Sequence, residues 1–164
     1  MRDKRGSCAD ECRSSFLCGK TRPGIQIKDP SSGETDTAKK ILIVEDNEDC
    51  RVILGSVLRC AGYEIVEVET GAEAIAKTIS ATPDLVIMDL DLPDMKGTDA
   101  ARALKKNVMT APIPIIAYSA WSAREWGEEA RAAGMVDYLE KPTQADQIRA
   151  KVERFIGPRK CETT

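Results

Sequence analysis

The chain has 164 residues, of which 42% are hydrophobic and only 4% aromatic, and its formal net charge is −3. This length is sufficient for one domain with a sizeable core, and so few aromatic residues argue against base stacking as a main function. Residues 1–40 contain nine Lys or Arg and six Asp or Glu, whereas residues 41–164 contain fifteen and twenty-one. The acidic main part favours cation binding, and we expect no direct DNA binding.

The sequence also argues against export and against a membrane span. No segment reaches the roughly 18 consecutive apolar residues of a transmembrane helix, and the charged N-terminus lacks the apolar core of a secretory signal. We therefore expect a cytoplasmic protein whose six cysteines are reduced. Because the chain has no His, catalysis by His and His-ligated zinc are excluded.

Residues 1–38 are predicted to be a disordered extension, because they are rich in Ser, Gly, Pro and charge and have no sustained apolar period. Cys8, Cys12 and Cys18 lie in it. A metal or redox cluster is the alternative, but three thiols without Cys-x-x-Cys spacing make a poor zinc site. We predict a folded domain over residues 39–157 and a short tail over 158–164, with no output domain.

The first half of the domain alternates strands and helices. An apolar run over residues 41–44 predicts a buried strand that stops at carboxylates, and residues 63–69 alternate in a way that suits an edge strand. Asn47 is predicted to cap the first helix, Gly62 to end it, and Thr70 to cap a second helix over 71–80. The apolar stripe of the first helix is Cys50, Ile53, Leu54, Val57, Leu58 and Ala61. The inward residues of the second helix are Ala74, Ile75 and Ile79.

The central stretch is the apolar run of residues 85–88, which follows a turn over 82–84 and ends abruptly at Asp89. Such a run predicts a strand that is buried on both faces. Ligands of open parallel sheets bind just beyond the carboxyl ends of the strands. Asp89 is therefore the first candidate for the chemistry.

The second half continues the alternation, with a helix over 98–107, a strand over 112–118, a helix over 121–133 and a strand over 136–139. Trp126 is predicted to pack in the core. Thr143 is predicted to cap the last helix, which stops at Gly157. The apolar stripe of that helix is Ala145, Ile148, Val152, Phe155 and Ile156. Five strands alternating with five helices predict a doubly wound α/β domain with a parallel sheet.

Polar residues follow four of the five strands, namely Glu45 and Asp46, Asp89, Ser119 and Lys141. In this fold they converge on one edge of the sheet. Three carboxylates repel one another unless a cation neutralises them, and a few hard oxygen ligands suit Mg²⁺. A metal, a lysine and a hydroxyl around one carboxylate can stabilise a phosphoryl group in transfer, with Asp89 as the nucleophile.

Together these residues resemble the receiver domain of two-component response regulators over residues 40–157. The motifs that carry the resemblance are Glu45-Asp46, Asp89, Ser119-Ala120 and Lys141-Pro142. The resemblance implies a flavodoxin-like (βα)5 fold with a five-stranded parallel sheet in the order 2-1-3-4-5. It also implies Mg²⁺ as cofactor and a signalling role rather than an enzymatic one.

The resemblance implies a role for each motif residue. Asp89 matches the phosphoacceptor. The implied metal ligands are Asp46 directly, Glu45 mostly through water, Asp89, and the backbone carbonyl of Asp91. Lys141 matches the lysine that pairs with the phosphate.

Further implied roles concern the switch. Ser119 and Ala120 match phosphate-binding positions, and Ser119 with Tyr138 matches the pair that rearranges on phosphorylation. The Lys141–Pro142 bond is typically cis in this family. Tyr118 and Trp121 depart from the small or acidic residues common beside the switch.

The implied phosphodonor is a sensor histidine kinase or a histidine phosphotransfer protein. The implied output is a downstream protein bound by the face of the fourth helix, fifth strand and fifth helix, through which a homodimer is also conceivable. Two alternatives stay open at this point. One is a degenerate binding module that works without phosphorylation. The other is an Asp-based phosphatase, because Asp89-Leu90-Asp91 has the Asp-x-Asp spacing of such enzymes.

Overall fold

The computed structural model describes residues 38–158, except for the Trp126 side chain. The predicted extension, with Cys8, Cys12 and Cys18, falls outside the described residues apart from Ala38, and so do tail residues 159–164 and the predicted packing of Trp126. Within the described part, no helix has the length and apolar character needed to cross a membrane. The predicted cytoplasmic location is not tested by this finding.

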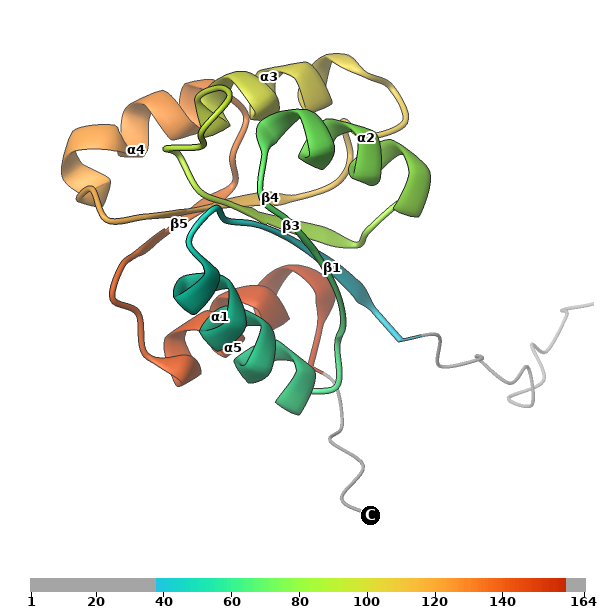
Figure 1. Cartoon of the computed structure of the whole chain (residues 1–164), viewed down its shortest axis with the longest axis vertical. Coiled ribbons are helices and arrows are strands. Elements are labelled where there is room, and N and C mark those ends of the chain that lie inside the picture. Colours follow the sequence, from blue (N-terminus) through green and yellow to red (C-terminus); the bar gives the residue numbers. More distant parts are fainter. Residues whose placement is uncertain (1–37, 159–164) are drawn as a thin grey trace, which may run out of the picture. The chain divides into compact units, whose positions relative to one another are not determined.

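Five parallel strands form one sheet in the order β2-β1-β3-β4-β5, which confirms the predicted fold class. The strands are β1 (Lys40–Val44), β2 (Glu64–Val68), β3 (Leu85–Met88), β4 (Ile115–Ser119) and β5 (Asp137–Glu140). The helices are α1 (Glu48–Cys60), α2 (Gly71–Ala81), α3 (Gly97–Lys106), α4 (Ala123–Ala132) and α5 (Ala145–Ile156). Helices α1 and α5 cover one face of the sheet, and α2, α3 and α4 cover the other (Figure 1).

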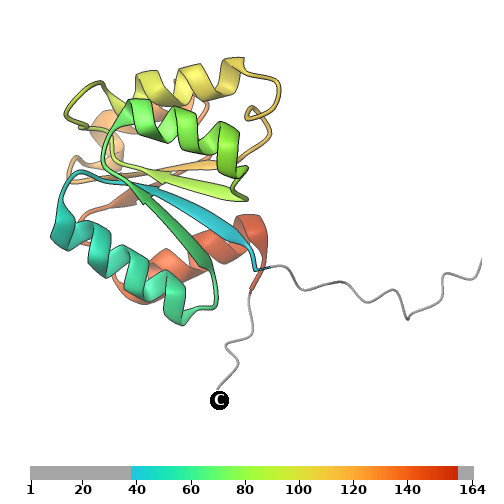
Figure 2. The same ribbon diagram turned by 45° about the vertical axis from the view of Figure 1, so that its right-hand side comes forward.

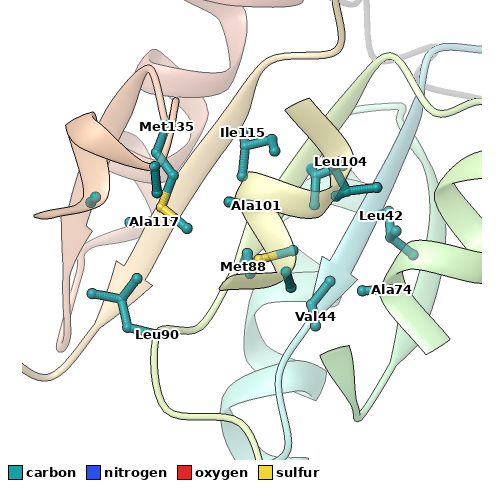
Figure 3. Close-up of a cluster of buried hydrophobic side chains, with 14 of the residues drawn as sticks. Leu42, Val44, Ala74, Met88, Leu90, Ala101, Leu104, Ile115, Ala117 and Met135 are labelled. Carbon is teal, nitrogen blue, oxygen red and sulfur yellow. The ribbon is translucent and has the colours of Figure 1, made fainter. Parts of the chain in front are cut away.

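The core consists of two layers of side chains, one on each face of the sheet, and Figure 2 shows the helices that lie on either side of the sheet. Successive side chains of a strand point to opposite faces. Accordingly, Leu42 and Val44 of β1 belong to the layer under α2 and α3, and Ile41 and Ile43 belong to the layer under α1 and α5. Figure 3 shows the first layer, with strand residues Leu42, Val44, Met88 and Ala117 near helix residues Ala74, Ala101 and Leu104. Burial on both faces explains why the central strands are continuous apolar runs.

Two predicted helix caps are confirmed and one is wrong. Asn47 accepts a hydrogen bond from the Cys50 backbone N–H at 2.9 Å, and the Thr70 hydroxyl accepts one from that of Glu73 at 3.2 Å. Helix α5, however, begins after Gln144, which makes no side-chain cap hydrogen bond. Thr143 does not cap it, because its hydroxyl donates back to the Glu140 carbonyl in the β5–α5 loop.

Three of the residues predicted to face inward are exposed, namely Ile53, Ile79 and Ala145. Helix α1 buries a narrow face made of Leu54, Gly55 and Leu58, so Ile53 lies to the side of it. In α2, buried Thr78 takes the inward position next to Ile79, and its hydroxyl donates to the Ala74 carbonyl at 2.6 Å. A polar residue can therefore be buried when its hydroxyl is satisfied within the helix.

Candidate functional site

The strand register brings the predicted site residues to one edge of the sheet. Val44 is paired with Met88, so Glu45 and Asp89 leave neighbouring strands at the same level. Ser119 is the last residue of β4 and is paired with Glu140, so Lys141 follows directly beside it. The backbone N–H of Lys141 donates to the Ser119 carbonyl at 2.8 Å. Parallel pairing alone thus gathers residues that are up to 96 positions apart in the sequence.

Lys141 joins the two buried carboxylates of the site. Its Nζ lies 2.6 Å from Glu45 Oε2 and 2.7 Å from Asp89 Oδ2. The side chain of Glu45 is 1% exposed, that of Asp89 is 9% exposed and that of Lys141 is 15% exposed. The ammonium also lies 4.8 Å from the centre of the Tyr118 ring, where a cation–π contact is favourable. The Lys141–Pro142 peptide bond is cis.

The pKa values of this cluster follow from burial and charge. Burial raises the pKa of Glu45, and the nearby charge of Asp89 acts in the same direction, while Lys141 opposes both. Burial alone would lower the pKa of Lys141, but hydrogen bonds to Asp89 and Glu45 outweigh it, and its pKa is raised. Lys141 therefore stays charged beside the carboxyl groups of Glu45 and Asp89.

The carboxylates have the chemistry of a magnesium site. Glu45, Asp46 and Asp89 each offer an oxygen atom, and these atoms lie within 4.8 Å of one another. Glu45 Oε1 is buried and has no hydrogen-bond partner among the described residues. Asp46 is exposed, so the cluster is open to solvent on one side. Hard oxygen donors that leave room for water suit Mg²⁺, and the donor set thus fits this ion.

Asp91 contributes to the site in two observed ways. Its backbone N–H donates to Asp89 Oδ1 at 3.2 Å. Its carboxylate accepts a hydrogen bond from the Trp121 indole N–H at 2.5 Å. This second contact was not predicted from the sequence, which indicated Trp121 only as a departure from the receiver pattern.

Trp121 also contacts the two predicted switch residues. Its backbone N–H donates to the hydroxyl of Ser119 at 3.3 Å, and its carbonyl accepts from the hydroxyl of Tyr138 at 2.8 Å. Ser119 is fully buried, whereas Tyr138 is half-buried and packs against the core. Ala120 lies between Ser119 and Trp121 and is exposed. The loop after β4 thus connects the loop after β3 with β5.

Two further residues that hold the site loops had no clear signal in the sequence. Arg51 of α1 donates to the backbone carbonyls of Glu45 and Asp46. Asp94 accepts hydrogen bonds from the backbone N–H groups of Gly71 and Ala72, at 2.8 and 2.9 Å, and so joins the loop after Asp89 to the start of α2. An Arg one turn into a helix and an Asp after Pro93 are both common on surfaces, so only the structure reveals these contacts.

The fold and the site together define a doubly wound α/β domain with a lysine-bridged acidic pocket at the carboxyl edge of its sheet. The family model of the response regulator receiver domain matches residues 41–153. The chain therefore belongs to the response regulator receiver domain family. Members of this family are signalling proteins that interact with histidine kinases or phosphotransfer proteins and bind Mg²⁺ at an acidic site.

Several relatives align with almost their full length. The polar-differentiation response regulator DivK of Brucella ovis is 29% identical over 119 residues, which are 73% of this chain and 97% of DivK. The chemotaxis protein CheY4 of Vibrio cholerae is 28% identical with a TM-score of 0.69, over 73% of this chain and 99% of that chain.

A third relative bears on the metal. The receiver domain of sensor histidine kinase PA1611 from Pseudomonas aeruginosa is 31% identical with a TM-score of 0.69, over 74% of this chain and 99% of that chain. Its structure has a magnesium ion coordinated in the active-site cleft. The chain thus functions as a receiver domain of two-component signalling.

Proposed function

We propose that Asp89 accepts a phosphoryl group from a phosphohistidine of a sensor kinase or of a phosphotransfer protein. The observation that carries this proposal is that Asp89 contacts Lys141 Nζ at 2.7 Å and lies beside the carboxylates of Glu45 and Asp46. An Asp89 oxygen attacks phosphorus, the P–N bond breaks, and the imidazole leaves with the bonding electron pair. The product is an aspartyl phosphate.

Glu45, Asp46, Asp89 and the backbone carbonyl of Asp91 are proposed to hold Mg²⁺. The ion, when bound, neutralises charge on the phosphoryl oxygens. Lys141 is held by two carboxylates before the reaction. It can turn part of its hydrogen bonding to a phosphoryl oxygen without a large movement, because its position is already fixed.

Ser119 and the backbone N–H of Ala120 are proposed to bind the phosphoryl group from the β4 side. The Ser119 hydroxyl accepts a hydrogen bond from the Trp121 backbone before phosphorylation. A phosphoryl oxygen is a strong acceptor that attracts this hydroxyl as a donor. Movement of Ser119 and Trp121 would then alter the carbonyl to which Tyr138 donates, so Tyr138 is the proposed second switch residue.

The proposed output surface is the α4–β5–α5 face, which Tyr138 adjoins. It contains a hollow of about 250 Å³ whose lining includes Ala130, Met135, Asp137 and Lys151. A change at Tyr138 alters this lining, and a downstream protein that fits one shape better than the other shifts the equilibrium between them. A second copy of the chain is the other candidate occupant of the face.

The phosphatase alternative has little support. Its second Asp must act as an acid or base, but the carboxylate of Asp91 is hydrogen-bonded to the Trp121 indole. The alternative of a binding module without phosphorylation would leave the buried cluster of Glu45, Asp89 and Lys141 without a use, although such a cluster is costly to desolvate.

The test is incubation with a small phosphodonor, such as acetyl phosphate, and Mg²⁺, followed by intact-protein mass spectrometry. We expect the mass of one phosphate to be added to the wild type and to the control variant Asp99→Asn, in which an exposed Asp of α3 is changed. We expect no addition to Asp89→Asn. An equal mass gain in Asp89→Asn would contradict the proposal.

A further inference from the structure

Arg51 contacts the acidic loop, residues 45–47, which joins β1 to α1. It lies in the first turns of α1. Its Nη1 is 2.7 Å from the Glu45 carbonyl oxygen and 3.3 Å from that of Asp46. Its Nη2 is 2.7 Å from Glu69 Oε1, just beyond the end of β2. The Arg51 side chain is only 12% exposed. One guanidinium therefore connects the acidic loop to the neighbouring strand.

Arg51 supplies side-chain hydrogen bonds to two carbonyl groups of this loop, those of Glu45 and Asp46, while the Asn47 carbonyl accepts from the Arg51 backbone N–H at 3.0 Å. Strand β1 ends at Val44 and α1 begins at Glu48. The Glu45 backbone N–H donates to the Val68 carbonyl at 3.1 Å, so its donor side is fixed by β2. Its acceptor side is fixed by Arg51. The two contacts together hold the peptide units from which the carboxylates of Glu45 and Asp46 project.

Glu69 is itself held in place, so Arg51 has a fixed partner. The backbone N–H of Glu69 donates to Glu73 Oε2 at 3.2 Å, and the Glu73 backbone N–H donates to the Thr70 hydroxyl at 3.2 Å. Glu73 thus links the backbone of Glu69 to the N-cap residue Thr70 at the start of α2. Through Arg51 and Glu69, the acidic loop is therefore connected to the β2–α2 junction as well as to β1.

We infer that Arg51 is a positioning residue for the metal site, which orients Glu45 and Asp46 through their backbone carbonyls. This inference rests on the proposed function of those two carboxylates as metal ligands. Arginine suits the role because its planar guanidinium presents several donors in a fixed geometry, whereas lysine is a point charge on a flexible stem. Residues that orient metal ligands typically change metal affinity about 10- to 100-fold when they are mutated.

The direction in which the Mg²⁺ affinity changes distinguishes a positioning role of Arg51 from a purely electrostatic one. A positive charge beside an acidic pocket repels Mg²⁺, so removal of the Arg51 charge alone would tighten Mg²⁺ binding. Loss of the fixed carbonyl contacts would weaken it. The substitution Arg51→Lys keeps the charge and removes the forked geometry, so it measures the second effect separately.

Arg59 provides a matched control on the same helix and the same neighbouring strand. Its Nη2 is 2.6 Å from Glu67 Oε1, much as Arg51 pairs with Glu69. Its side chain is 51% exposed, and it lies two turns farther from the acidic loop. Arg59→Lys thus changes an α1–β2 ion pair without changing a contact to the loop.

The experiment is titration of the full chain with MgCl₂ by isothermal calorimetry, with urea unfolding of each variant as a check on stability. We expect Arg51→Lys to bind Mg²⁺ about tenfold more weakly than the wild type and Arg59→Lys to bind it within about twofold. At saturating Mg²⁺, phosphorylation of Arg51→Lys by acetyl phosphate should recover toward the wild-type rate, because the defect lies in metal affinity.

A second variant, Glu69→Gln, leaves Arg51 unchanged but weakens its partner, and we expect a smaller loss of Mg²⁺ affinity, about threefold. Equal affinity of the wild type and Arg51→Lys would overturn the inference and leave the proposed function intact. An equal loss in Arg59→Lys would also overturn it. A wild type without measurable Mg²⁺ binding would overturn both.

Discussion

Removal of Lys141 is the perturbation with the largest expected effect on stability. In Lys141→Met, the buried carboxylates of Glu45 and Asp89 lose the ammonium that lies 2.6 and 2.7 Å from them. Oxygen atoms of these carboxylates lie within 4.8 Å of each other. Two like charges at that distance repel by about 3.5 kcal/mol at an effective dielectric constant of about 20. Loss of one partner from a buried pair typically costs about 3–5 kcal/mol.

We therefore expect Lys141→Met to lower the free energy of unfolding by about 3 kcal/mol at neutral pH without Mg²⁺. The loss should shrink as the pH falls toward the raised pKa of Glu45, because Glu45 then takes up a proton and the repulsion is relieved. Mg²⁺ should restore part of the stability, because it binds to the same carboxylates without competition from Lys141.

The assay is urea unfolding followed by circular dichroism, at neutral and at acidic pH, with EDTA or with Mg²⁺. The control is Lys39→Met, because Lys39 makes a 2.9 Å ion pair with Asp84 but is 44% exposed. An exposed pair of this kind contributes about 0.5 kcal/mol. If Lys141→Met lost no more stability than Lys39→Met, the reasoning about the buried charge cluster would be refuted.

Three further predictions concern Trp121, Gly97 and Lys151. Trp121→Phe removes the indole N–H that binds Asp91. It should accelerate loss of the phosphoryl group several-fold by admitting water, as measured by phosphate release. An unchanged rate would argue that Trp121 does not shield the phosphoryl group from water. Gly97→Ala places a Cβ 2.0 Å from the Asp89 carbonyl oxygen and should lower the free energy of unfolding by about 2 kcal/mol or more. Gly127→Ala is the control: nothing lies within 4 Å of its new Cβ, and it should raise the free energy of unfolding by about 0.5 kcal/mol. Equal effects of the two substitutions in urea unfolding would contradict this. Lys151 lies 2.5 Å from Asp137; burial opposes ionisation of Asp137, but its hydrogen bond to Lys151 and one from the Tyr138 backbone outweigh this and lower its pKa. Lys151→Met should therefore be less stable than the wild type above the unfolded carboxyl pKa of about 3.9, and the difference should shrink as the pH falls through the lower folded pKa. The part that remains in acid comes from the lost 2.7 Å hydrogen bond to the Tyr138 carbonyl, and a difference that does not shrink at all would exclude this linkage.

Much of the fold could be predicted because a strand that is buried on both faces of the sheet is a continuous apolar run in the sequence. The runs 41–44 and 85–88 are apolar throughout, and all eight residues are buried. The edge position of β2 was also predicted correctly from its alternation. Periodicity failed at Ile53 and Ile79, because a helix that rests on a sheet buries a narrower stripe than the spacing of its apolar residues suggests.

The proximity of the candidate site residues could be predicted for a related reason. Glu45, Asp89, Ser119 and Lys141 lie at or just after strand ends, and parallel strands bring their ends together. The contact of Trp121 with Asp91 and that of Arg51 with the acidic loop could not be predicted, because each depends on the rotamer of a long side chain. Thr143 shows the same limit, because its hydroxyl can accept from a helix N–H or donate to a loop carbonyl, and the sequence does not rank the two.

The central claim is that Asp89 is the residue that carries the phosphoryl group. The direct measurement is tandem mass spectrometry after borohydride reduction, which converts an aspartyl phosphate into homoserine and so marks its position. After incubation with acetyl phosphate and Mg²⁺, homoserine is expected at position 89, and it should be absent when EDTA replaces Mg²⁺. Homoserine at position 46 or 91, or none in the presence of donor and Mg²⁺, would contradict the account.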